Sequence, residues 1–237
     1  MSASDEGRAI AKEYLDFKQK ELNQTDDTEV AFGTLLYEMG EWRKSGTYFE
    51  NLLHHRPNDS QIYFGIGRSY NASSEFDQAL SYFKRAYNLS MSNANKNTAF
   101  TAKICCSTLR AYHDSGNFDQ ALALGDEALG LYRHLDEHAH AVGIAQVLIN
   151  IGLVHFDKAY TLKNRGEVLF ALGDLIGALE LFEKALEMYS RIFREDKNHR
   201  DIAKCQHLIG MTHLAIGNYN KAVEALDTAF DYPSNDG

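Results

Sequence analysis

The stretch Ser74-Glu-Phe-Asp-Gln-Ala79-Leu-Ser-Tyr-Phe83-Lys-Arg-Ala86 decides the fold of this chain. In it, a turn residue is followed after five positions by a small residue, after nine by a bulky one and after twelve by another apolar one. The same frame returns in four further places along the 237 residues, except that Gly125 stands in the place of the bulky residue in the third unit. Their turn residues are Gly40, Gly116, Gly173 and Gly217. Self-similarity at a period of 20–50 residues is typical of stacked repeats. The sequence therefore favours a binding scaffold over a catalyst.

Each unit is predicted to be a pair of helices. Small or apolar residues lie seven and four positions before each turn residue, as Gly67 and Tyr70 do before Ser74, except that His213 stands four positions before Gly217. These two offsets share one face of a helix. The offsets after the turn mark the stripe of a second helix. A glycine inside a helix costs about 1 kcal/mol relative to alanine, so Gly67 indicates the close approach of another helix. One pair cannot bury both stripes alone, and we expect the pairs to stack.

The pattern resembles the tetratricopeptide repeat family. The residues that carry the resemblance are Gly33/Gly40/Ser45/Phe49/Pro57, Ile66-Gly67/Tyr70/Phe76/Ala79/Phe83/Ala86, Tyr112/Gly116/Phe118/Ala121/Ala128, Gly166/Gly173/Ala178/Phe182/Ala185 and Gly210/Gly217/Tyr219/Ala222/Ala229. The resemblance implies an all-α, right-handed solenoid of helix-turn-helix repeats. It also implies that the first helices line a concave groove. Turn-to-turn intervals near 42 residues make the chain most similar to the repeats of kinesin light chains and Pins-type proteins. Leu109 and Gly125 depart from the pattern, so we expect looser packing in the third unit.

We expect a single solenoid domain over residues 1–237, with a capping helix at 5–23. Repeats are predicted near 26–59, 60–93, 102–135, 159–192 and 203–233.

The interval between the turn residues Gly116 and Gly173 is irregular. Ile151-Gly152 repeats the signature of a first helix, but no well-patterned second helix follows it. We favour an unpaired extra helix at 138–157, and the alternative is one long helix over 139–171. Gly152 and Gly166 are fourteen residues apart, which would keep both nearly on one face of a straight helix.

Composition narrows the class of function. The formal charge of −9 disfavours nucleic acid as a partner, because phosphate binding needs a local excess of Lys and Arg. The apolar stretch 141–154 is shorter than a membrane span of about 20 residues, so no membrane partner is expected. Three cysteines cannot form a disulfide framework, which favours a reducing compartment and a cytoplasmic location. No phosphate-binding loop and no catalytic triad order is present, so we expect neither an enzyme nor a cofactor.

Histidines 134, 138 and 140 raise the question of a metal site. Two imidazoles one helical turn apart can hold a metal ion. Neither a His-Glu-x-x-His nor a Cys-x-x-Cys motif accompanies them. We therefore interpret them as a solvated helix end and predict no metal.

The resemblance places the groove at fixed offsets before each turn residue. The candidate contacts are Tyr37, Phe64, Arg68, Asn71, Lys103, Arg110, His113, Ile149, Phe156 and Lys163. Basic residues outnumber acidic ones at these offsets, whereas the whole chain has 33 acidic and 24 basic residues. This reversal favours an acidic or C-terminal peptide as the guest, with the cations as anchors. Val30 and Thr34 stand where the two-carboxylate clamp of heat-shock co-chaperones needs Lys and Asn.

The primary hypothesis is a scaffold or adaptor that binds a protein or peptide partner. Two other interpretations stay open. The last repeat has no predicted cap, so it could form a homo-oligomer through its exposed apolar surface. The chain could also be the regulatory repeat region of a larger multidomain protein.

Overall fold

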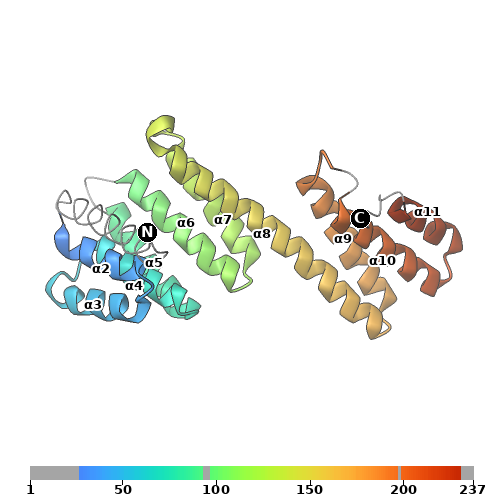
Figure 1. Ribbon diagram of the computed structural model, residues 1–237, viewed down its shortest axis with the longest axis horizontal. Coiled ribbons are helices and arrows are strands. Elements are labelled where there is room, and N and C mark those ends of the chain that lie inside the picture. The colour runs from blue at the N-terminus through green and yellow to red at the C-terminus, as the bar shows by residue number, and fades with distance from the viewer. Residues whose placement is uncertain (1–26, 93–96, 197–198, 231–237) are drawn as a thin grey trace, which may run out of the picture. The chain divides into compact units, whose positions relative to one another are not determined.

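A computed structural model describes residues 27–92, 97–196 and 199–230. These residues form ten helices and no strand (Figure 1). The helices are α2 (Thr28–Glu38), α3 (Trp42–His55), α4 (Ser60–Ala72), α5 (Phe76–Ser92), α6 (Thr98–Asp114), α7 (Phe118–Tyr132), α8 (Glu137–Ala171), α9 (Leu175–Ile192), α10 (Arg200–Ile216) and α11 (Tyr219–Phe230). The predicted all-α class is confirmed. The predicted capping helix at 5–23 lies outside the described residues.

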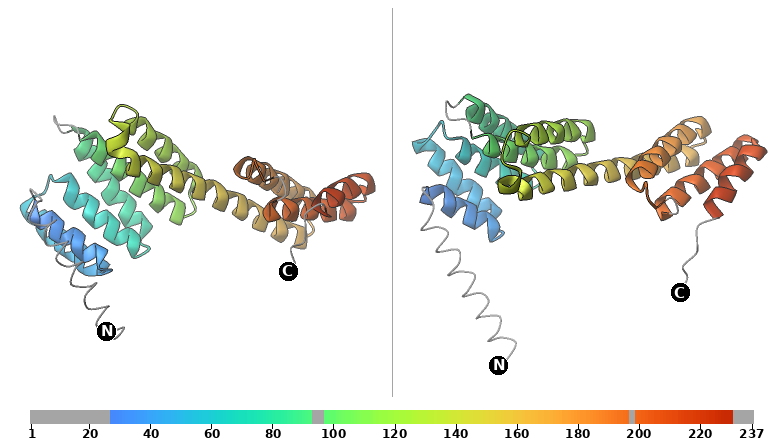
Figure 2. Two further views of the ribbon diagram at one scale, coloured as in Figure 1. Left: turned by 45° about the horizontal axis from the view of Figure 1, so that its top comes forward. Right: turned by 90° about the horizontal axis from the view of Figure 1, so that it is seen from above.

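The chain divides into two compact units, with the boundary between Ile144 and Ala145 inside α8. In the first unit, the first helices α2, α4 and α6 lie side by side, and the second helices α3, α5 and α7 pack against them (Figures 1 and 2). In the second unit, α10 packs against both α9 and α11. Four of the predicted repeats contain a helix pair of their own, whereas the repeat at 159–192 takes its first helix from the C-terminal part of α8. The single solenoid over residues 1–237 stays a prediction.

The predicted turn residues adopt the backbone that the frame requires. Gly40, Gly116, Gly173 and Gly217 have φ between 79° and 90°, in the left-handed region that glycine enters without strain. Ser74 adopts φ 62° at the equivalent position without being glycine. The origin of the repeat frame is therefore a real left-handed turn in all five units.

Close packing around Gly67 explains the glycines inside the first helices. A Cβ atom at this position would lie 2.7 Å from the Phe83 ring and 3.3 Å from the backbone oxygen of Ala79. Equivalent Cβ atoms at Gly33 and Gly166 would meet aromatic rings at 2.5 Å. The bulky residue nine positions after the turn therefore covers the glycine most closely, and the backbone of the small residue at plus five forms the wall behind it.

The favoured interpretation of 138–157 as a separate helix is wrong. Helix α8 continues without a break from Glu137 to Ala171, as in the alternative interpretation. No proline and no left-handed glycine interrupts it, because Gly152 and Gly166 both lie in its interior. Gly166 is covered by Phe182, whereas a Cβ at Gly152 would meet nothing within 4 Å. The repeat signature at Gly152 thus marks a first-helix segment without its usual covering side chain.

By length and composition, residues 139–171 of α8 could also cross a membrane, and 17% of the most apolar segment of this helix is buried. A core helix of a soluble protein passes the same test, so a single such helix is weak evidence. Within the second unit, Phe156 and Ala159 pack with Tyr189 of α9 and Cys205 of α10. We therefore describe α8 as a helix of the repeat array.

Candidate functional site

Helices α2, α4 and α6 of the first unit carry seven of the ten predicted contact residues. We call the surface that these residues form the first-helix face, and it comprises Tyr37, Phe64, Arg68, Asn71, Lys103, Arg110 and His113. The guanidinium carbon of Arg68 lies 3.9 Å from the centroid of the Tyr37 ring. The Lys103 ammonium of α6 lies 5.8 Å from the Phe64 ring of α4. Residues from three successive repeats therefore meet on one surface.

Phe64 forms the base of this surface rather than a contact point. Its side chain is 5% exposed, and its ring lies 5.4 Å from Phe100 and 5.9 Å from Phe83. Both Arg68 and Lys103 lie over this ring. A cation held over an aromatic ring gains about 0.5–1 kcal/mol at an exposed site, which restricts its position without neutralising its charge.

The two cations act on each other electrostatically. Desolvation, followed by repulsion from Arg68, lowers the pKa of the Lys103 ammonium, and Glu38 acts in the opposite direction. Two like charges held near one another are stabilised by an anion that contacts both. The surface is therefore suited to a carboxylate.

Asn71 belongs to the same face. Its Oδ1 atom is buried and has no hydrogen-bond partner in the described part of the chain. Buried amide oxygens normally accept a hydrogen bond, but this one is covered by protein atoms, so a guest reaches it only if the side chain turns outward. Arg110 is exposed on α6, whereas the ring of His113, near the end of α6, lies 6.0 Å from the ring of Phe118 at the start of α7.

The three remaining predicted residues lie on α8, in the second unit. Ile149 is exposed, as a contact residue should be. Phe156 instead packs on the rings of Tyr189 and Phe193 at 5.7 and 6.3 Å. Lys163 is largely buried, and its Nζ lies 3.3 Å from Glu167 Oε1. Of these three, Ile149 alone is exposed as the prediction requires.

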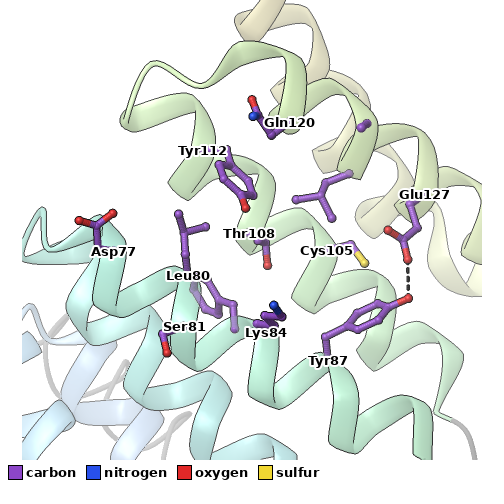
Figure 3. A pocket seen from close by; sticks show the side chains of 13 residues that line it. Asp77, Leu80, Ser81, Lys84, Tyr87, Cys105, Thr108, Tyr112, Gln120 and Glu127 are labelled. Atoms are coloured by element: carbon purple, nitrogen blue, oxygen red, sulfur yellow. Dashed lines mark hydrogen bonds between the residues drawn. The ribbon is translucent and has the colours of Figure 1, made fainter.

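A pocket that the prediction missed lies between the second helices α5 and α7, with α6 as its floor (Figure 3). It has a volume of about 720 Å³. It is lined by Asp77, Leu80, Ser81, Phe83, Lys84, Tyr87, Cys105, Thr108, Tyr112, Gln120, Ala123, Leu124 and Glu127. The departure at Gly125 indicated loose packing in the third unit, but only residue-by-residue comparison of the repeats would have located the pocket.

Within the described residues, no cluster of three His, Cys, Asp or Glu side chains could hold a metal ion.

Two family models of the tetratricopeptide repeat match the chain, at residues 30–94 and 157–232, and together they cover more than half of it. The chain belongs to the tetratricopeptide repeat family. This assignment confirms the family and the helical repeat architecture that the sequence predicted. Tetratricopeptide repeats are a protein-interaction fold, and the chain is accordingly a protein-interaction scaffold.

Several solved tetratricopeptide structures are similar to the chain. One is YrrB, described as having an unusual peptide-binding site, with 18% identity, coverage of 92% of this chain and 91% of that one, and a TM-score of 0.45. Another is the Rap conjugation gene regulator of plasmid pLS20 in complex with the Phr* peptide, with 15% identity, coverage of 86% and 52%, and a TM-score of 0.47. A third is a kinesin light chain-like repeat protein of Podosopora anserina, with 13% identity, coverage of 86% and 93%, and a TM-score of 0.41. No curated protein sequence matches the chain.

These structural similarities are too low to carry an argument about partners. The closer resemblance to kinesin-light-chain-like repeats therefore stays a prediction.

Proposed function

We propose that the protein is a cytoplasmic adaptor that binds an acidic peptide segment of a partner protein on the first-helix face. The proposal includes no catalytic step, no nucleic acid and no membrane. The observation that carries it is the pair of cations, Arg68 and Lys103, held over the rings of Tyr37 and Phe64.

The proposed binding mode assigns a role to each group. Arg68 can form two parallel hydrogen bonds to one carboxylate, and Lys103 adds a point charge beside it. Asn71 would contribute a hydrogen bond only after its side chain turns outward, because its Oδ1 atom is buried. The exposed Arg110 extends the positive surface along α6. The whole chain has a formal net charge of −9, so an acidic peptide would be repelled by most of the surface and attracted to this positive face.

The test uses a defined probe. A fluorescent ten-residue peptide of alternating Asp and Leu with a free C-terminus is titrated with the full chain, and fluorescence anisotropy reports binding. We expect Arg68→Glu combined with Lys103→Glu to weaken binding at least tenfold, which corresponds to about 1.4 kcal/mol. Raising the salt from about 50 to about 200 mM should also weaken binding to the wild-type protein, because salt screens exposed charges.

The matched control combines Arg133→Glu with Lys221→Glu. Both residues are exposed and lie outside the first-helix face, and the change in net charge is the same. If the control weakens binding as much as the test variant does, net charge rather than this face attracts the peptide. If the test variant binds like the wild type, the electrostatic part of the proposal is wrong.

A second candidate function is self-association through α11. Tyr219 and Val223 on this helix are 67% and 57% exposed, which leaves an apolar strip uncovered in the second unit. Light scattering tests this candidate by comparing the wild type with Tyr219→Glu plus Val223→Glu. A wild-type protein that is a monomer at about 100 μM would exclude it.

A further inference from the structure

The pocket between α5 and α7 has a counterpart one repeat earlier, between α3 and α5. In that earlier groove, tyrosine rings occupy the space above α4. Tyr82 stacks on Tyr70 with ring centroids 5.4 Å apart and planes at 8°, and it lies 6.2 Å from Tyr63. The Tyr70 hydroxyl donates a hydrogen bond of 2.9 Å to Glu50. The space left beside Tyr70 and Glu50 is about 310 Å³.

The repeat frame pairs each residue of one groove with a residue of the other. Leu124 takes the place of Tyr82, Cys105 that of Tyr63, and Lys84 that of Glu50. Tyr112 keeps the place of Tyr70. Two phenol rings of the earlier groove are thus replaced by the smaller side chains of Leu124 and Cys105. The pocket between α5 and α7 is about 720 Å³, more than twice the volume of the earlier one. A pocket of this volume falls in the range of small-ligand sites.

The groups that line the pocket determine which kind of ligand it can bind. Tyr112 points its ring and hydroxyl into the pocket (Figure 3), and no hydrogen bond joins that hydroxyl to another described residue. Leu80, Phe83 and Leu124 supply apolar walls. At one end, the Tyr87 hydroxyl donates a hydrogen bond of 2.5 Å to Glu127.

The charges at the pocket are mixed, and they favour no charged guest. Lys84 is the positively charged residue of the lining, and Asp77 and Glu127 are the negatively charged ones. An anion would be repelled by the two carboxylates. A cation would be attracted by them, but it would be repelled by Lys84 and would have to give up its hydration between apolar walls. A neutral ring with a hydroxyl group avoids both penalties and can hydrogen-bond to Tyr112.

We propose that this pocket binds a tyrosine side chain presented by a partner segment, which takes the place that Tyr82 occupies one repeat earlier. The inference rests on the proposed function, in that the chain binds proteins, but it uses a different surface. Aromatic side chains that fill pockets are frequent anchors of protein interfaces. The partner's ring would stack on Tyr112 as Tyr82 stacks on Tyr70, and its hydroxyl would hydrogen-bond to Tyr112 or Lys84.

The test uses p-cresol, which is the side chain of tyrosine, and N-acetyltyrosinamide, which adds the peptide backbone. Both are titrated into the full chain labelled with ¹³C at leucine methyl groups. We expect saturable shifts of the Leu80 and Leu124 methyl signals. 4-Methylbenzoate and 4-methylbenzylamine, which carry a charge of either sign, should bind at least fivefold more weakly than p-cresol.

Two variants fill the pocket with side chains that the previous repeat already accommodates. Leu124→Tyr restores the counterpart of Tyr82, and Thr108→Ile restores the counterpart of Ile66. Each should weaken p-cresol binding at least fivefold, and the second keeps the test valid if the first does not fold. Leu172→Tyr is the matched control, because Leu172 is 76% exposed in the second unit and far along the chain.

The outcomes separate this inference from the proposed function. Leu124→Tyr should leave the affinity for the acidic peptide unchanged, and Arg68→Glu plus Lys103→Glu should leave p-cresol binding unchanged. The inference is wrong if p-cresol causes no saturable shift at the pocket, or if both filling variants bind it like the wild type. Preferential binding of either charged analogue would also overturn it.

Discussion

Two glycines at the same position of the repeat frame should respond to alanine in opposite ways. Alanine is favoured over glycine in a helix by about 1 kcal/mol, so each substitution gains that amount from the backbone. At Gly152, the new methyl group meets open space, and the gain should be realised in full. At Gly67, the methyl group would lie 2.7 Å from the ring of Phe83, which is 1% exposed and has no room to move.

Overpacking of a filled core costs about 1–3 kcal/mol. With a cost near the middle of that range, Gly67→Ala should lower the free energy of unfolding by about 1 kcal/mol, and Gly152→Ala should raise it by about 1 kcal/mol. The two variants would then differ by about 2 kcal/mol although the chemical change is identical.

Urea denaturation followed by far-UV circular dichroism measures both shifts. Trp42, the single tryptophan of the chain, reports separately on the first unit, where Gly67 lies. The reasoning is refuted if Gly67→Ala raises the midpoint as Gly152→Ala does, because the Phe83 ring would then not be held against the glycine. A fall in the midpoint of Gly152→Ala would show that this position is covered.

Two further predictions concern groups with shifted pKa values. The hydrogen bond from Arg56 holds the pKa of Asp27 below its ordinary value near 3.8, so this ion pair stabilises the folded chain above that pH and ceases to do so as the pH falls through the lowered value. Arg56→Leu should therefore lower the melting temperature at pH 7 but much less near pH 2, and an equal loss at both pH values would contradict this. Burial raises the pKa of the Cys105 and Cys205 thiols to about 12, so iodoacetamide at pH 8 should modify the half-buried Cys106 first in the native protein, as tandem mass spectrometry would show. Equal labelling of all three thiols before unfolding would show that the two sites are open to solvent.

The repeat frame predicted the helix pairs because each unit carries its own local signals. The turn residue, the glycine of the first helix and the bulky residue of the second lie within about 20 residues of one another. Ser74 was placed correctly as a turn residue although it is not glycine, because the flanking offsets fixed its position.

The course of α8 could not be derived in the same way. Ile151-Gly152 has the local signature of a repeat, and the sequence alone does not say that the chain continues as a helix where a turn is expected. Whether α8 continues depends on there being no helix-ending residue, such as a proline or a left-handed glycine, near residue 158. The lack of such a residue is weaker evidence for a continuous helix than its presence would be for a turn.

The candidate sites differ in the same way in how far the sequence predicted them. The offsets placed Arg68, Asn71 and Lys103 on one face, and the structure brings Arg68 onto Tyr37 across two repeats. The offsets did not show that Phe64 is buried beneath the cations, because burial depends on Phe100 from the next repeat. The pocket between α5 and α7 arises from what two positions lack, and it becomes visible only when the space left by the missing rings is measured.

The left-handed turn at Ser74 has a consequence for how the second repeat comes to be ordered. A residue with a side chain pays roughly 1 kcal/mol or more to enter this conformation, whereas the glycines of the other four units enter it freely. The bend between α4 and α5 is thus imposed by the neighbouring helices against local preference. This repeat should accordingly be the least autonomous of the five, and it would acquire its native hairpin only once an adjacent pair is already in place.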